Sequence, residues 1–365
     1  MKKRFFNHLK KIDWLLIVVA LLLVGVGLVS LYSSSLGKGD FSNFRKQVIF
    51  FGVGFFLMFL LSFLDWRALR DDPYLILIFY LVCLLSLFFL FFFAPEIRGV
   101  KSWYKIGSLS VDPIELTKLV LIILLAKYFS TRHIEMYQIK HILLSGIYIL
   151  FPAVLVFLQP NLGSVLILIA LWVGILLLSG IKTRHFLILC FCFLLAFILS
   201  WQFLLKDYQR ERVINFVAPQ LADPLKMGWS QNQAKIAIGS GGIFGKGLGK
   251  GSQTQYGFLP ESQTDFIFAA IAEETGLIGV SFLFLLFLIL IWRILKITIS
   301  SHTNFPRLFA SGFSILLVSQ IFINIGMNIG ILPIIGVSLP FVSYGGSGLI
   351  STFLALGLLQ SIKSH

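Results

Sequence analysis

Residues 14–33 read WLLIVVALLLVGVGLVSLYS, twenty residues without a charged side chain. A helix of that length is about 30 Å long, which matches the thickness of the hydrocarbon core of a bilayer. Residues 1–13, MKKRFFNHLKKID, are basic, and the apolar run that follows them is too long for the core of a cleaved signal peptide. The sequence therefore predicts a retained membrane-spanning helix with a cytoplasmic N-terminus.

Similar apolar runs recur along the 365-residue chain. Hydrophobic residues make up 58% of it and charged residues only 13%, where a soluble domain has roughly a quarter. Membrane barrels would instead show strands of roughly ten residues with alternating hydrophobicity. We therefore expect an all-α, polytopic integral membrane protein that forms a single domain over residues 1–365. We place ten spans near residues 14–33, 48–64, 74–93, 114–129, 142–158, 162–180, 186–205, 266–292, 308–332 and 347–362.

The net charge of +14 does not indicate a nucleic-acid partner, because the basic residues are spread over the edges of the spans. In the ten-span arrangement the cytoplasmic segments carry more Lys and Arg than the short outer loops, in agreement with the positive-inside rule. This arrangement makes residues 206–265 a large extracytoplasmic loop. Cys83, Cys190 and Cys192 fall within predicted spans, so we expect buried thiols rather than a metal site.

The long loop ends at Asp265, directly before the span predicted at 266–292. A long polar segment inside a membrane protein is more often a functional site than a spacer. The carboxylate at its end could cap the following helix through backbone N–H groups, or it could be the reactive group of a site at the membrane surface. The residues alone leave both interpretations open.

Two other parts of this loop have a composition that suits anion binding. Seven glycines fall within residues 236–251, IAIGSGGIFGKGLGKG, where backbone N–H groups could converge on phosphate oxygens beside Lys246. Their spacing fits neither the P-loop nor the dinucleotide fingerprint. Upstream, Lys206, Arg210 and Arg212 form a basic cluster that either binds an anion or lies at the level of the lipid headgroups.

The start of the span at 114–129 carries a pair of opposite charges. Asp112 followed by a proline predicts a helix N-cap, and Glu115 occupies the third helical position of a capping box. Lys118 lies on the same helix face as Glu115, roughly 8 Å inside the helix start. A charge inside a membrane is costly, so the pair is either a structural ion pair or the wall of a cavity that binds substrate.

Other polar residues fall inside the later spans. Glu273 and Glu274 are two turns into an apolar helix, where a carboxylate needs a proton, a basic partner or water. Asn324 and Asn328 have i, i+4 spacing, and we expect them to hydrogen-bond across helices.

Five motifs, in order along essentially the whole chain, resemble the SEDS family (shape, elongation, division and sporulation). They are QP with LG at 159–163, AIGSGG at 237–242, LPE at 259–261, TDFIFA at 264–269 and LPFVSYGGS at 339–347. The residues of the glycine-rich stretch (236–251) and of the LPE motif are most similar to those of the elongation branch, represented by RodA.

Three positions depart from the usual family motifs. Asn161 stands where the family has Asp, and Gln263 stands where it has His, so neither supplies an acid or a base here. Residues 112–115 read DPIE, where the family has Gln-Pro-Ser-Glu.

The resemblance implies a peptidoglycan glycosyltransferase of cell-wall elongation, which polymerises lipid II into β-1,4 glycan strands. It implies a class B penicillin-binding protein transpeptidase as partner, and a location in the bacterial cytoplasmic membrane with the active site on the extracytoplasmic side. Asp265 matches the family's catalytic aspartate, expected to be a general base. The sequence identifies no metal ligand set and leaves a divalent cation open. An alternative is a lipid II flippase of the same family, which forms no bond.

We expect the substrate, with its diphosphate, to contact Glu115, Lys118, Arg210, Arg212, Lys246, Gln263, Thr264 and Ser343.

Overall fold

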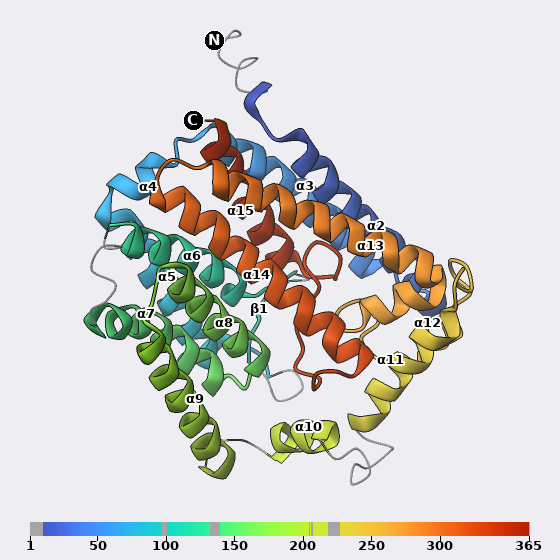
Figure 1. Cartoon of the computed structure of the whole chain (residues 1–365). Coiled ribbons are helices and arrows are strands. Elements are labelled where there is room, and N and C mark those ends of the chain that lie inside the picture. The colour runs from blue at the N-terminus through green and yellow to red at the C-terminus, as the bar shows by residue number, and fades with distance from the viewer. Residues whose placement is uncertain are drawn as a thin grey trace.

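The structure is a computed structural model that describes residues 10–96, 101–107, 109–131, 139–203, 205, 207–217 and 227–364. Figure 1 shows that the described helices pack beside one another in a bundle, with the last helix near its centre. The elements are α2 (Trp14–Lys38), α3 (Ser42–Phe63), α4 (Arg67–Asp71), α5 (Pro73–Phe93), β1 (Tyr104–Ile106), β2 (Leu109–Val111), α6 (Pro113–Ser130), α7 (Ile139–Leu158), α8 (Leu162–Leu178), α9 (Thr183–Phe203), α10 (Asp207–Val217), α11 (Met227–Gly241), α12 (Ser252–Gln255), α13 (Ile267–Ser300), α14 (Asn304–Ile329) and α15 (Gly346–Ser364).

Seven of the described helices are long and apolar enough to cross a membrane: α2, α3, α5, α7, α9, α13 and α14. The apolar helix α8 is shorter, α6 contains charged residues, and α15 contains several glycines and serines. A helix thus lies at each of the ten predicted spans, and the all-α membrane fold is confirmed. That α6, α8 and α15 also cross the membrane remains a prediction.

The C-terminal helix α15 packs most extensively against α3, and α14 packs against α6, α8 and α13. Small residues allow the first of these contacts to be close. A Cβ added at Gly357 would lie 2.7 Å from the carbonyl oxygen of Met58, so only glycine fits there. Helices α14 and α15 therefore give the other elements a rigid frame.

One end of the bundle is joined by a buried carboxylate. Asp13 caps α2 by accepting from the N–H of Leu16, and it binds Arg293 of α13 and Lys363 of α15. Burial alone would raise the pKa of Asp13, but hydrogen bonds from the two basic side chains hold it below its ordinary value. The ion cluster thus joins three helices that are far apart in sequence.

The cysteine prediction is correct for one residue and wrong for two. Cys83 is buried, whereas Cys190 and Cys192 are exposed on α9. None of the α9 side chains is buried, because this helix lies along the outside of the bundle. A helix in that position faces lipid over most of its circumference.

The predicted extracytoplasmic loop at 206–265 contains helices α10, α11 and α12, and its side of the membrane remains a prediction. Residues 242–251 of the glycine-rich stretch follow α11 and pack against a break in α13, where Gly276 has a φ of 64°. The N–H groups of Lys246 and Gly247 donate to the carbonyls of Glu273 and Glu274, at 3.0 and 2.9 Å. The glycine-rich stretch thus pairs with backbone groups that the break frees.

The two adjacent glutamates of α13 find polar partners in the same region. The carboxylate of Glu273 accepts from the N–H and the hydroxyl of Thr254 and from the ammonium of Lys246. Glu274 accepts from the hydroxyl of Ser33 in α2. Both carboxylates are therefore buried with hydrogen-bond donors around them, and they fix the glycine-rich stretch to α2 and α13.

Candidate functional site

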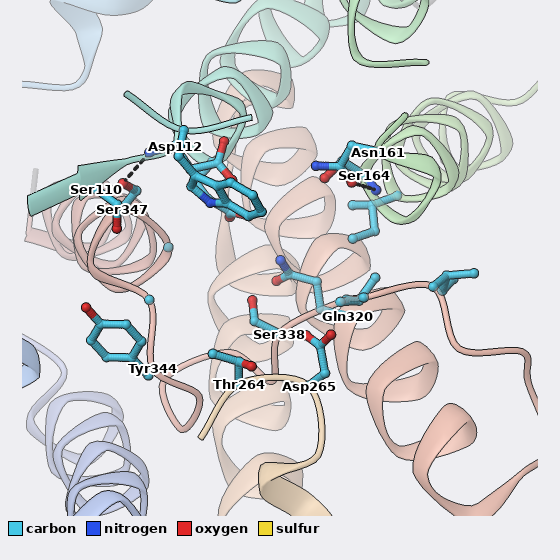
Figure 2. A pocket seen from close by; sticks show the side chains of 18 of the residues that line it. Ser110, Asp112, Asn161, Ser164, Thr264, Asp265, Gln320, Ser338, Tyr344 and Ser347 are labelled. Atoms are coloured by element: carbon cyan, nitrogen blue, oxygen red, sulfur yellow. Dashed lines mark hydrogen bonds between the residues drawn. The ribbon is translucent and has the colours of Figure 1, made fainter. Parts of the chain in front are cut away.

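Segments far apart in the sequence enclose a cavity of about 580 Å³. Its walls come from the β1–β2 hairpin, the start of α6, the turn before α8, α10, residues 261–265, α14, and the loop and helix start at 335–348 (Figure 2). The charged groups that line it are the cations Lys105, Lys118 and Arg212 and the carboxylates Asp112, Glu115, Glu261 and Asp265. The cavity can therefore bind a ligand that carries both anionic and hydroxyl groups.

Asp265 lines the cavity and is not the N-cap residue of α13. The helix begins at Ile267, and its N-cap residue is Phe266, whose side chain makes no cap hydrogen bond. In Figure 2 the Asp265 carboxylate points into the cavity beside Ser338 and Thr264. Asp265 therefore lies one residue before the N-cap position, and its role as the reactive group remains a prediction.

The backbone before α13 is held by three consecutive carbonyls, those of residues 263–265. The N–H of Tyr344 donates to the first at 2.8 Å, and the hydroxyl of Ser343 donates to the second at 2.7 Å. The side-chain amides of Asn324 and Asn328 both donate to the third, each at 3.0 Å. We call these four donors the carbonyl clamp. It fixes the position from which the Asp265 carboxylate projects.

The asparagines of the clamp confirm the prediction that they bond across helices. Both are fully buried on α14. Asn328 also accepts from the N–H of Ala269 at 3.2 Å, and Asn324 also donates to the carbonyl of Val337 at 2.7 Å. Because each amide has more than one partner, the first turn of α13 is held in register with α14.

Glu115 and Lys118 face the same cavity from α6. Their ion pair has an Nζ–Oε1 distance of 2.6 Å, and the side chain of Lys118 is only 2% exposed. The pair is therefore structural and also faces the cavity, which combines the two interpretations that the sequence left open. A buried lysine beside one carboxylate provides a positive charge that little water screens.

Asp112 brings a further carboxyl group to this wall. It caps α6 through the N–H of Ile114 at 3.1 Å, as predicted, and its own N–H donates to the hydroxyl of Ser347 at 2.8 Å. Burial, followed by the nearby charge of Glu115, raises the pKa of Asp112 to about 7, although Lys118 acts in the opposite direction. In the sequence, the only signal that Asp112 belongs to the cavity wall was the unusual Asp in the DPIE motif.

Five of the nine predicted site residues line the cavity, namely Glu115, Lys118, Arg212, Thr264 and Asp265. The structure does not bring the other four to its wall. Arg210 donates to the carbonyl of Gln202. Ser343 belongs to the carbonyl clamp. Lys206, from the same basic cluster, lies outside the described residues.

Lys246 and Gln263 also make structural contacts. The Lys246 ammonium bonds to Glu273 and to Ser252, at 3.1 and 2.8 Å. The Gln263 amide accepts from Asn43 and donates to a serine of α2. Lys246 is thus paired within the protein away from the cavity wall, and phosphate binding by the glycine-rich stretch stays a prediction.

The family model described as "Cell cycle protein", for FtsW, RodA and SpoVE, matches residues 13–365. The chain is 36% identical to peptidoglycan glycosyltransferase MrdB of Escherichia coli (strain K12), over 100% of this chain and 96% of that protein. It is 32% identical to stage V sporulation protein E of Bacillus subtilis (strain 168), over 97% of each.

Solved structures are similar over almost the same extent. A chain from a peptidoglycan synthase complex has a TM-score of 0.81 and 31% identity, covering 96% of this chain and 97% of that chain. The crystal structure of the rod shape determining protein RodA of Thermus thermophilus has a TM-score of 0.71 and 30% identity, covering 96% of each chain. Because sequence and structure match over nearly the whole length, the chain belongs to the FtsW/RodA/SpoVE family of membrane proteins.

Proposed function

We propose that this chain is a peptidoglycan glycosyltransferase that polymerises lipid II, with Asp265 as the general base. The observation that carries the proposal is a carboxylate inside a cavity lined by three cations, on a residue whose backbone carbonyl is held by the carbonyl clamp. A relative covering the whole chain is itself named a peptidoglycan glycosyltransferase, which supports the assignment. A flippase would share such a cavity, but no feature of it favours transport over bond formation.

In the proposed reaction Asp265 takes the proton from the 4-hydroxyl of the acceptor sugar. The resulting oxygen attacks the anomeric carbon of the donor, the bond from that carbon to phosphate breaks, and the lipid diphosphate leaves. An α-linked donor giving a β-linked product needs one inversion, so a single base suffices. General-base assistance contributes about 10²–10⁴-fold, and positioning and charge stabilisation supply the rest.

The leaving diphosphate requires positive charge, which Lys105, Lys118 and Arg212 provide around the cavity. Lys118 is held by Glu115, so its ammonium is in place before substrate arrives. Charges fixed in advance stabilise a transition state without reorganising during the reaction. Glu115 thus acts as a positioning residue for Lys118, and Thr264 lies beside Asp265 in the cavity wall.

We further propose that the cavity opens to the extracytoplasmic side of the bacterial cytoplasmic membrane. The excess of basic residues in the predicted cytoplasmic segments supports this orientation. Apolar surfaces between helices would hold the lipid tails. The match to a chain of a peptidoglycan synthase complex supports a class B penicillin-binding protein as partner.

Asp265→Asn tests the activity. We expect polymerisation of lipid II by the protein with its transpeptidase partner to fall about 10²–10⁴-fold, because the carboxamide cannot accept the proton. Affinity for lipid II should stay within about threefold, since the carbonyl clamp is unchanged. Glu261→Gln removes another carboxylate of the same cavity, and we expect a smaller loss of activity. Equal polymer from wild type and Asp265→Asn would rule out Asp265 as the base.

Asn324→Ala and Asn328→Ala test the carbonyl clamp. Each removes a donor to the carbonyl of Asp265, so the carboxylate should lose its fixed position while substrate groups are untouched. We expect kcat to fall about tenfold or more with little change in KM, a split that general destabilisation would not give. Polymerisation kinetics of folded variants at several lipid II concentrations measure this. A change in KM alone would contradict it.

Asp112 predicts a dependence on pH. Its carboxyl group loses its proton as the pH rises through its pKa of about 7. The new negative charge lies on the wall that carries Lys118, so affinity for the anionic lipid should fall as the pH rises from 6 to 8. Asp112→Asn remains neutral, and its affinity should not fall over this range. The same decline in both proteins would show that another group titrates.

A further inference from the structure

Gln320 is a buried amide in the wall of the cavity. It lies on α14, its side chain is 3% exposed, and it projects toward the cavity between Asp112 and Asp265 in Figure 2. Its Oε1 has no hydrogen-bond partner among the residues that the structure describes. A buried polar atom without a partner destabilises the protein, so an apolar residue of the same shape would be at least as stable there.

The next two amides along this helix behave differently. Asn324 is one helical turn further along, about 6 Å by helix geometry, and Asn328 is two turns further. Both have several protein partners. Gln320 thus stands apart as the amide of this helix face that is left for a ligand to satisfy.

The unpaired atom is an acceptor, which limits the ligand group that can meet it. Deprotonated diphosphate oxygens have no hydrogen to donate, and a lipid tail has no polar hydrogen. The sugars of lipid II carry acetamido groups, each with an N–H donor and a carbonyl acceptor that match both ends of a glutamine amide. Because Gln320 is one turn from the residue that holds Asp265, sugars near the reacting atoms reach it more readily than the peptide.

We propose that Gln320 binds the 2-acetamido group of a sugar in the substrate, with Oε1 accepting the acetamido N–H. The inference rests on the proposed function, because it takes the occupant of the cavity to be the amino sugars of lipid II. It makes Gln320 a determinant of specificity for N-acetylated sugars. A site with a buried acceptor rejects an analogue that lacks the matching donor.

The same helix offers a matched control. Ser314 is buried on α14, and its hydroxyl also has no partner among the described residues, but it does not line the cavity. Gln320→Met and Ser314→Ala each replace an unpaired polar group with an apolar one of similar or smaller size. Neither change should lower the thermal stability of the substrate-free protein by more than a degree or two, since no internal hydrogen bond is lost. A large loss in Gln320→Met would overturn the proposal, because it would mean that the amide is paired within the protein.

The experiment measures binding of lipid II and of an analogue whose 2-acetamido groups are replaced by 2-acetoxy esters, which lack the N–H. Each variant is made in the Asp265→Asn protein with its transpeptidase partner, so that turnover is too slow to affect the binding measurement. We expect the ester to bind the Asp265→Asn protein about tenfold more weakly than lipid II does. Adding Gln320→Met should weaken the binding of lipid II by a similar factor and should not weaken the binding of the ester any further. Adding Ser314→Ala should change neither affinity.

Two results would overturn the inference. Unchanged affinity for lipid II in Gln320→Met would mean that the substrate does not touch this amide. The loss of affinity caused by Gln320→Met could multiply with the loss caused by the ester replacement. That result would mean that Gln320 contacts another group, such as a hydroxyl or the peptide. Because binding is measured without turnover, a failure of the wild type to polymerise would contradict the proposed function and leave this binding result intact.

Discussion

The structure depends on how the backbone before α13 is satisfied. Residues 263–265 precede the helix, so their carbonyls have no helical partners, and an unpaired carbonyl inside a membrane protein is costly. The carbonyl clamp supplies donors from α14 and from the turn at 343–344. This arrangement places a carboxylate in a cavity while every carbonyl behind it is paired. The clamp therefore links the packing of α13, α14 and the turn at 343–344 to the position of one cavity carboxylate.

The same physical demand explains the glycine-rich stretch. A break in α13 at Gly276 frees backbone groups, and two N–H groups of the stretch pair with them. Glycine allows the close approach that these bonds need, since a Cβ at Gly245 would lie only 2.2 Å from the carbonyl oxygen of Glu274. In the structure these glycines serve the packing of α13. The cations that line the cavity come instead from the hairpin, α6 and α10.

The sequence predicts the helices well because an apolar run long enough to cross a bilayer is a strong local signal. It also identifies Asp265 and the Glu115–Lys118 pair, since charges at the edge of a span need a reason to be there. It could not show that Lys246 and Ser343 point away from the cavity, because their partners are 27 and 79 residues away in the chain. Gln320 was missed for the same reason, since a lone glutamine in a span does not reveal whether it has a partner. Tertiary packing alone settles which polar residues are structural.

The most direct measurement of the central claim is an experimental structure of the Asp265→Asn protein with lipid II bound. The account predicts that the 4-hydroxyl of the acceptor sugar lies within about 3 Å of the side chain of residue 265. It also predicts that the diphosphate lies beside Lys118 and Arg212. An acceptor hydroxyl far from residue 265, or a diphosphate bound by the glycine-rich stretch, would contradict it.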